Sequence, residues 1–338
     1  MKFIYGPVPS RRLGQSLGID PIPLKTCNWN CVYCQLGRTR PLVNERAHYF
    51  PVGEILLQVE KSLASHKPGE IDWITFVGSG EPTLHAGIGR MIREVKIITD
   101  IPVAVITNGA LFYLPEVREE LFAADAVLPS LDAGTPELYR RVNRPYPEIT
   151  FERHISGLIS FSREYRGELW PEVMLVQGLN DSEQALRHLA EAFQEMSPDE
   201  VHINLPTRPP VETWVKAPDD EGILRALAIL GDAARVVHPV EGIFDLGEVE
   251  NVVDAVIGII TRHPMREDQL MRTLSRWSVD KVSEALIDLE NDGRAQSIER
   301  FGIRFWCAKK SFYPEDAHNN KTDQERQTVI SPYPKNLE

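Results

Sequence analysis

The sequence has little cysteine and no long apolar run. Only four of its 338 residues are Cys, and no hydrophobic stretch approaches the roughly 18 residues needed to cross a bilayer. The opening MKFIYGPVPSRRLG has no apolar core of the length found in secretion signals. These absences argue against a membrane protein and against a secreted, disulfide-held one, so we expect a cytoplasmic protein without a membrane partner. Cysteines that cluster in that compartment indicate metal or redox chemistry.

The sequence also lacks a strongly basic segment. Residues 51–260 carry 17 Lys and Arg against 34 Asp and Glu, and residues 261–310 carry ten against eight. The charge distribution therefore permits a nucleic-acid partner but gives no positive evidence for one. Only residues 1–50 are clearly basic, with seven Lys and Arg against two acids. That surplus suits either an anionic group near the cysteines or an ordinary solvated surface.

Short apolar runs alternate with helical patterns through most of the chain. Amphipathic stretches at 52–66 and 181–196 separate some of the predicted strands, which lie at 16–24, 73–78, 103–108, 126–132, 172–178 and 201–206. Such alternation predicts an α/β fold with parallel strands and outer helices. The periodicity leaves open whether six strands form a barrel or an open sheet.

The pattern changes near residue 260. Two short helices precede a hairpin at 295–308, and Val279, Val282, Leu286 and Leu289 share one face of the second helix. Helices followed by a hairpin suggest a small winged-helix-like domain. We therefore expect a larger domain at 1–240, a connecting segment at 241–260, a winged helix-turn-helix-like domain at 261–310 and a polar, flexible tail at 311–338.

Three cysteines, Cys27, Cys31 and Cys34, follow the spacing C-x3-C-x2-C in CNWNCVYCQ. A four-cysteine zinc site would need a fourth ligand, and Cys307 lies 273 residues further on, where alternation suggests a buried small side chain. Three thiolates at this spacing instead suit a [4Fe–4S] cluster whose fourth iron is left free. A chance grouping of buried thiols is the alternative.

With an aromatic residue, Tyr33, before the third cysteine, this motif resembles that of the radical S-adenosylmethionine (SAM) superfamily. The resemblance implies a partial (β/α)6 TIM-like barrel whose cysteine loop follows the first strand. It also implies an enzyme in which SAM chelates the free iron. A single-electron donor such as flavodoxin or ferredoxin reduces the cluster, SAM is cleaved, and the 5'-deoxyadenosyl radical abstracts hydrogen from a substrate, here unidentified.

Further stretches match that superfamily in order. GSGEP at 78–82 resembles its GGEP motif, which implies that Gly78, Ser79, Gly80 and Glu81 meet the SAM amino group, and ITNG at 106–109 adds Asn108. Glycines there let carbonyls approach an ammonium closely. Alternation places Ser130 and Asp132 together on one strand face, toward the SAM ribose, although Asp132 also suits a turn or cap.

Other candidates come from the later strands and from irregular, proline-bracketed loops. Met174 suits the adenine or plain core packing, and His202 and Asn204 suit the barrel interior or a satisfied core. Arginines are expected to hold a carboxylate or an anionic substrate. Arg144 is the candidate for SAM, and the arginines predicted at the cavity mouth are Arg11, Arg12 and Arg208.

The stretch from Gly6 to Gly37 is also similar to a narrower branch of iron–sulfur oxidoreductases related to the wyosine-forming tRNA enzymes. Those enzymes carry a second cysteine triplet upstream, and no cysteine precedes Cys27 here. We therefore do not transfer their reaction. Two alternatives stay open: an iron–sulfur or SAM-responsive winged-helix regulator that binds DNA, and an RNA-modifying radical SAM enzyme.

Overall fold

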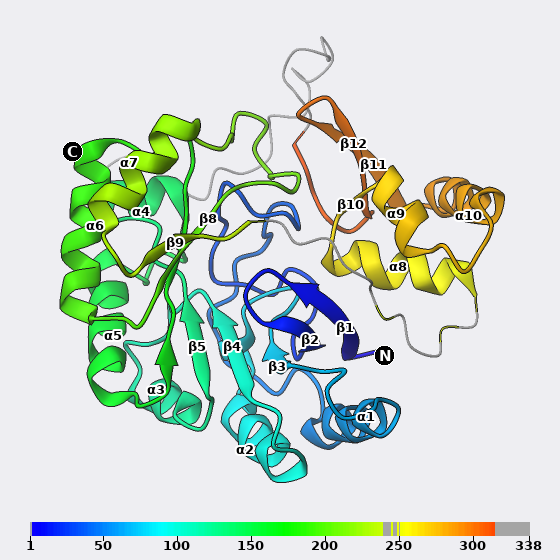
Figure 1. The fold of residues 1–338 in the computed structure, drawn as a ribbon, viewed down its shortest axis with the longest axis horizontal. Helices are drawn as coiled ribbons and strands as arrows, with labels where there is room; N and C mark the ends of the chain where they lie inside the picture. Colours follow the sequence, from blue (N-terminus) through cyan, green and yellow to red (C-terminus); the bar gives the residue numbers. More distant parts are fainter. Residues whose placement is uncertain (1, 239–244, 246–248, 250, 315–338) are drawn as a thin grey trace, which may run out of the picture.

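The computed structural model describes residues 2–238, 245, 249 and 251–314. In these residues the chain is a mixed α/β protein with two parts that lie side by side (Figure 1). The larger part, from blue to yellow-green, has strands inside and helices outside. The smaller part, yellow to orange, consists of the last helices and strands. The expected tail at 311–338 falls largely outside the described residues, whereas the expected connecting segment at 241–260 is described at 245, 249 and 251–260.

The described strands of the larger part form two sheets. Its strands are β1 (Ile4–Ser10), β2 (Gly14–Ile19), β3 (Trp73–Phe76), β4 (Val103–Thr107), β5 (Ala126–Pro129), β6 (Glu168–Leu169), β7 (Glu172–Met174), β8 (Val201–Asn204) and β9 (Ala234–Val236). The first sheet has the order β1 to β6, antiparallel only between β1 and β2. The second has the order β7-β8-β9 and is parallel.

An isolated parallel bridge between Ser130 and Glu172 joins the two sheets edge to edge. The amide of Leu131 donates to the carbonyl of Glu172 at 2.8 Å, which continues the connection from β5 to β7. The parallel arrangement predicted from the sequence is therefore confirmed. The carboxyl ends of β2 to β5, β7 and β8 meet at one edge, which is where loops build a site in such folds.

Helices cover the outer face of these sheets, as Figure 1 shows for α1 to α3 and for α5 to α7. The helices of the larger part are α1 (Val52–Ala64), the 3-10 turn η1 (Pro82–Leu84), α2 (Ile88–Ile98), α3 (Pro115–Leu121), α4 (Pro136–Val142), α5 (Phe151–Glu164), α6 (Glu183–Met196) and α7 (Asp220–Leu230). The Ser182 side chain accepts from the Ala185 amide and caps the start of α6.

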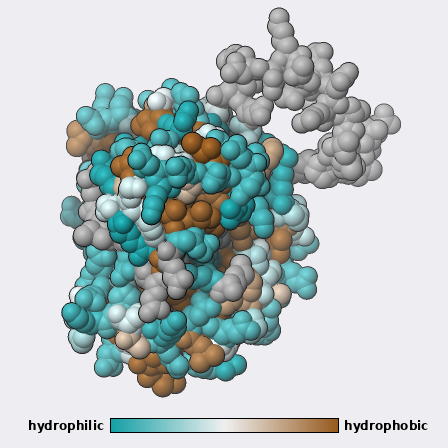
Figure 2. Space-filling model, turned by 90° about the vertical axis from the view of Figure 1, so that its right-hand side faces the viewer, coloured by the Kyte–Doolittle hydropathy of each residue, from teal (hydrophilic) through white to brown (hydrophobic). Residues whose placement is uncertain are grey.

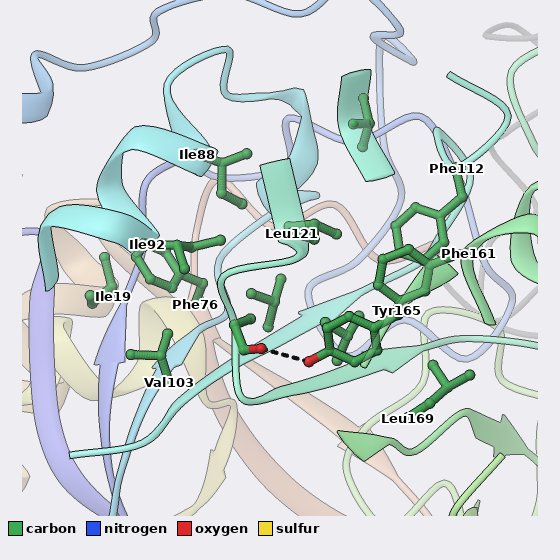
Figure 3. Close-up of a cluster of buried hydrophobic side chains, with 14 of the residues drawn as sticks. Ile19, Phe76, Ile88, Ile92, Val103, Phe112, Leu121, Phe161, Tyr165 and Leu169 are labelled. Carbon is green, nitrogen blue, oxygen red and sulfur yellow. Dashed lines mark hydrogen bonds between the residues drawn. The ribbon is translucent and has the colours of Figure 1, made fainter. Parts of the chain in front are cut away.

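The main core lies between the first sheet and its helices (Figure 3). Ile19, Phe76 and Val103 from the strands meet Ile92 of α2 and Leu121 of α3 in one buried cluster. The hydroxyl of Tyr165 donates to the Ala124 carbonyl at 2.8 Å, drawn as a dashed line. Burial of these side chains supplies most of the free energy that fixes the strand ends.

The C-terminal part has its own core. Its elements are α8 (Val252–Arg262), β10 (Met265–Arg266), α9 (Glu267–Thr273), α10 (Val279–Asn291), β11 (Ala295–Arg300) and β12 (Ile303–Ala308), with sheet order β10-β12-β11. The hairpin expected at 295–308 is confirmed. Val282, Leu286 and Leu289 are buried, but Val279 is 63% exposed, so its assignment to the buried face was wrong. It occupies the first position of α10, beyond the edge of the core.

The segment expected to connect the parts contains α8, which packs with α10 and β12 in the C-terminal core. The face formed by the C-terminal elements is mainly hydrophilic, with separated hydrophobic patches (Figure 2). Large exposed apolar residues of these elements include Ile287, Phe301 and Ile303. None of the described helices combines the length and the apolar character that spanning a membrane requires.

The two parts are joined by polar contacts at the end of α8. The Arg262 Nε atom donates to Asp20 Oδ2 at 2.8 Å, and its guanidinium lies 5.0 Å from the ring centre of Tyr5 on β1. Gln35 Nε2 donates to the Arg262 carbonyl at 3.3 Å. Further along, the Tyr313 hydroxyl donates to the Gln35 carbonyl. The C-terminal part therefore docks directly on the loop that carries the cysteines.

Candidate functional site

The cysteines lie in the loop between β2 and α1, at the carboxyl edge of the first sheet. Cys27, Cys31 and Cys34 all line one cavity of about 400 Å³, called here the cysteine cavity. Its walls come from β1 and β2, the loops after β3 and β8, and the end of α8. The sequence prediction that these three thiols share one site agrees with this geometry.

Two apolar side chains fix the cysteine loop. Trp29 is buried against Tyr139 and His154, and Val32 is buried against Val142 and Val176. Backbone bonds reinforce this packing: the Val32 amide donates to the Val142 carbonyl at 2.9 Å, and the Tyr146 amide to the Asn28 carbonyl at 2.7 Å. Trp29 and Val32 therefore anchor the loop in the core, while all three cysteines line the cavity.

Each sulfur has a polar neighbour. Lys25 Nζ lies 3.1 Å from the sulfur of Cys34, Asn108 Nδ2 lies 3.8 Å from that of Cys27, and Asn143 Nδ2 lies 3.8 Å from that of Cys31. Burial acts to lower the pKa of Lys25, but the cysteine sulfurs outweigh it and the pKa is raised. One cation and two amide N–H donors around three sulfurs would stabilise the negative charge of thiolates that bind a metal group.

Burial raises the pKa of Cys27 to about 12 and that of Cys31 well above its usual value, so burial in the absence of a metal favours the protonated thiol at these two positions. No three His, Cys, Asp or Glu side chains of the described chain converge closely enough to hold a single metal ion. In a [4Fe–4S] cluster each thiolate binds a different iron, so the sulfurs surround a cube instead of converging. The three cysteines fit such a cluster.

The segment after β3 packs tightly against the cysteine loop. The Lys25 amide donates to the Ser79 carbonyl at 2.6 Å, and the Glu81 amide to the Thr26 carbonyl at 2.9 Å. A Cβ atom on Gly80 would lie 2.0 Å from the Thr26 carbonyl oxygen. The Ser79 hydroxyl donates to Asp20 Oδ2 at 2.7 Å. Glycine at 80 is thus required by a close backbone approach.

Glu81 is buried and has four donors. Its carboxylate accepts from the amide and hydroxyl of Thr83, from the hydroxyl of Thr107 at 2.6 Å and from the amide of Asn108 at 2.7 Å. Burial raises the pKa of Glu81, and these bonds oppose the rise. The Asn108 side chain donates to Asn28 Oδ1 at 2.7 Å. Glu81 and Asn108 therefore connect the ends of β3 and β4 to the cysteine loop.

Asp132 lies just beyond β5, which ends at Pro129. Its carboxylate accepts from the Tyr33 hydroxyl at 2.5 Å, from Asn143 Nδ2 at 2.6 Å and from the Met174 amide at 2.7 Å. Burial raises its pKa to about 6, despite these bonds. Asp132 thereby holds the aromatic side chain that precedes Cys34.

The candidates for cofactor binding fall into two groups. Tyr33, Gly78, Ser79, Gly80 and Met174 line the cysteine cavity. The described lining does not include a second group, which comprises Glu81, Asn108, Ser130, Asp132 and Arg144. Asp132 contacts Tyr33 and Met174 of the first group, and Glu81 directly follows Gly80. Asn108 instead contacts Cys27, and Ser130 forms a bridge with Glu172.

Arg144 lies on another side of the cysteine loop. Its backbone has a φ of 46°, and its NH1 group donates to Glu212 Oε1 at 2.5 Å, where Arg38 also binds. It lines a separate cavity of about 480 Å³ with Trp214. Arg144 is therefore already paired with a carboxylate in this structure.

The arginines predicted at the cavity mouth, Arg11, Arg12 and Arg208, do line the cysteine cavity. Asn204 lines it too, whereas His202 is buried beside Trp170. Its Nε2 contacts Glu200 at 2.8 Å, and its buried Nδ1 has no hydrogen-bond partner among the described residues, so it is only partly satisfied in the core. Cys307 is buried in the C-terminal part, as expected of a small apolar side chain.

Sequence reasoning missed three lining residues: Gln35, Glu172 and His263. Gln35 directly follows Cys34, and that position was the available signal. Glu172 begins β7, where its carboxylate pairs with Arg12. His263 follows α8 and contacts Arg208, a long-range contact with no local signal.

This chain is similar to several known proteins. Residues 22–190 match the sequence model of the Radical SAM superfamily. A UPF0026 protein of Methanocaldococcus jannaschii is 35% identical over 305 residues, covering 87% of this chain and 95% of that protein. A protein of Brachyspira hyodysenteriae named GTPase Obg is 38% identical over 298 residues, covering 87% of this chain.

This chain spans only 43% of the Brachyspira protein's length, and it has no Gly-Lys dipeptide, which a phosphate-binding P-loop requires. Among solved structures, Streptococcus suis SuiB bound to S-adenosylmethionine is similar, with a TM-score of 0.48 and 18% identity. That match covers 67% of this chain and 50% of the other. The superfamily pairs SAM with a [4Fe–4S] cluster, and the C-x3-C-x2-C pattern is present here.

Proposed function

This chain belongs to the radical SAM superfamily, and from that premise we propose that it cleaves SAM reductively with a cluster held by Cys27, Cys31 and Cys34. When bound, the reduced [4Fe–4S] cluster supplies the electron that cleaves SAM, and the resulting 5'-deoxyadenosyl radical takes hydrogen from a substrate. The observation that carries the proposal is the single cavity that all three cysteines line. The electron comes from a flavodoxin or a ferredoxin.

The residues around the sulfurs have distinct roles in this proposal. Lys25, Asn108 and Asn143 lie within 3.1 to 3.8 Å of the three sulfurs and stabilise negative charge there. Trp29 and Val32 keep the loop seated in the core. Cysteine protons leave when iron binds, so the ligand set is complete only with the metal present.

We propose that SAM lies against the lining residues Tyr33, Gly78, Ser79, Gly80 and Met174. Gly78 and Gly80 have no side chains on this wall, and Ser79 directs its hydroxyl to Asp20, so a bound group can approach the backbone closely. Glu81, Asn108, Ser130 and Asp132 act as positioning residues, because their contacts fix the lining residues. Arg144 reaches the SAM carboxylate only if it leaves Glu212.

For the C-terminal part we propose a winged helix-turn-helix-like module. The order α8, β10, α9, α10, β11 and β12, with β12 between the other two strands, supports this assignment. We propose a boundary near residue 250, because α8 packs with this module. None of the relatives named above is described as a DNA-binding regulator or as an RNA-modifying enzyme, so we do not favour those alternatives.

The test is anaerobic reconstitution with iron and sulfide, followed by dithionite and SAM. We expect about four irons for each chain, visible charge-transfer absorbance and formation of 5'-deoxyadenosine. Cys31→Ala loses both the absorbance and the product. Cys307→Ala is the matched control and keeps both, since Cys307 is buried in the C-terminal core. An intact cluster in the Cys27, Cys31 and Cys34 triple alanine variant refutes the ligand assignment.

A further inference from the structure

The lining of the cysteine cavity is rich in cations. Arg11, Arg12, Arg208 and Lys25 line it, and the carboxylate in its described lining is that of Glu172. Arg12 occupies that carboxylate and also donates to Asn204 Oδ1 at 3.2 Å. Lys25 is engaged at the sulfur of Cys34. The other two cations of the lining are the guanidinium groups of Arg11 and Arg208.

Neither of these two groups forms an ion pair with a carboxylate among the described residues. Arg208 NH1 donates to the Gln35 side-chain oxygen at 3.0 Å and to His263 Nδ1 at 2.9 Å. Arg11 NH2 donates to the Thr207 hydroxyl at 2.7 Å. All three partners are uncharged, since burial holds the pKa of His263 well below its usual value. Charges removed from water without a counter-ion cost free energy.

The electrostatic cost of placing these two guanidinium groups near each other and away from water affects the pKa of Arg208. Burial lowers it to about 10, and the neighbouring Arg11 contributes in the same direction. Burial and Arg12 also lower the pKa of Arg11. A bound anion would remove both penalties, because each guanidinium presents paired donors that match an oxyanion.

The backbone holds both arginines where a ligand can reach them. Arg11 lies in the turn between β1 and β2, and Arg208 lies in the proline-bracketed loop after β8. Gln35, which fixes Arg208, directly follows Cys34. The wall beside Arg208 is His263, from the C-terminal part. The arginine pair thus shares one cavity with the three sulfurs.

We propose that Arg11 and Arg208 bind an oxyanion of the substrate, a phosphoryl or carboxylate group, within the cysteine cavity. The inference rests on the proposed function for the identity of the reaction. It adds the substrate class: a small anionic molecule, bound through its anion beside a wall contributed by the C-terminal part.

The experiment uses the full-length, reconstituted protein, with pyrophosphate and succinate as probes in isothermal titration calorimetry. SAM is present in one series and absent in the other. We expect saturable binding of at least one probe, and we expect Arg11→Gln and Arg208→Gln each to weaken it about tenfold or more. Arg187→Gln is the matched control, because Arg187 is exposed on α6 and pairs with Glu183. It binds the probe like the wild type.

Each alternative has its own outcome. If the two arginines hold the SAM carboxylate, the variants lose SAM affinity and bind the probes normally, which overturns the proposal. Equal binding by all variants overturns it as well. Arg208→Lys keeps the charge and separates loss of binding from misfolding, with circular dichroism as the fold check; probe binding that fails to recover in folded Arg208→Lys leaves the charge argument refuted. Probe binding in a protein that never forms 5'-deoxyadenosine retains the anion site and refutes the reaction instead.

Discussion

His154 on α5 supports the cysteine loop without touching a sulfur. It is fully buried, its ring stacks on Tyr139 with centroids 5.1 Å apart, and it meets the edge of Trp29 at the same distance. Burial lowers the pKa of His154 to about 4. The folded protein therefore favours the neutral imidazole of His154, against which Trp29 packs.

This requirement predicts a pH dependence of stability. A lowered histidine pKa contributes stability that is present above the unfolded pKa and is lost as pH falls toward the folded value. Between pH 7.5 and pH 5 we expect the wild type to lose about 2 kcal/mol of unfolding free energy through His154. His154→Phe keeps a ring in place and removes this loss. Chemical denaturation of both apoproteins at the two pH values measures the difference.

Parallel losses in the wild type and in His154→Phe contradict the assignment. In that case the acid sensitivity comes from other groups, and the buried ring tolerates protonation. Fluorescence of the tryptophans during unfolding reports the same transition at both pH values, which keeps the comparison internally consistent.

Single residues also show what sequence can predict about the site. The three cysteines, Tyr33 and the glycines of 78–80 were identifiable because their spacing is local and their chemistry is specific. Arg11, Arg12 and Arg208 were identifiable from irregular backbone around them. Glu172 and His263 were not, because their partners lie more than 50 residues away and no local pattern marks them.

At the scale of elements, the segment after β3 and the cysteine loop are joined by direct backbone contacts. Gly80→Ala would place a methyl group 2.0 Å from the Thr26 carbonyl oxygen and 2.8 Å from its carbon, and both are backbone atoms. We expect a loss of about 2 kcal/mol of unfolding free energy, with weaker iron retention because Thr26 precedes Cys27. Thermal unfolding and iron content after gel filtration measure the two effects.

Gly258→Ala is the matched control for that change. Gly258 lies inside α8 with no atom within 4 Å of a Cβ, so alanine is expected to raise stability by about 0.5–1 kcal/mol. If both variants retain iron and stability equally, the backbone at 26 and 80 moves apart without cost, and the tight contact has no role in holding the loop.

The elements themselves were largely predictable. The six predicted strands exist, because buried parallel strands show as short apolar runs between helical patterns. Four of the described strands were missed: β1, β6, β9 and β10. β1 contains two prolines and pairs only with β2, at the edge of the sheet. The strand predicted at 126–132 ends at Pro129. Asp132 therefore lies beyond the strand, and the in-and-out alternation of strand side chains cannot be used to orient it.

At the scale of the whole molecule, one ion pair connects the two parts. Asp20 is 4% exposed and accepts from Arg262 on one side and from Ser79 on the other. Arg262→Gln leaves that buried carboxylate with Ser79 alone, so we expect a loss of about 3 kcal/mol. Hydrogen exchange at the amides of α8 and the melting temperature measure it.

Arg272→Gln provides the comparison within the C-terminal part. Arg272 is 62% exposed and pairs with Asp268 one turn away, a contact worth about 0.5 kcal/mol. Equal exchange at α8 in the two variants contradicts a role for Arg262 in docking. Faster exchange in Arg262→Gln alone agrees with a docking role for the Arg262–Asp20 ion pair.

Gln35 has a further consequence, which concerns the order in which the protein is made. Its side chain and its carbonyl contact Arg262 and Tyr313, residues that leave the ribosome long after the cysteines. At about 5 to 20 residues per second, the 278 residues from Gln35 to Tyr313 take roughly 15 to 55 s to synthesise. During that interval the nascent cysteine loop has no C-terminal wall and is open to iron and sulfide carriers. Once they are made, Arg262 and Tyr313 contact Gln35 and close this side of the cysteine loop.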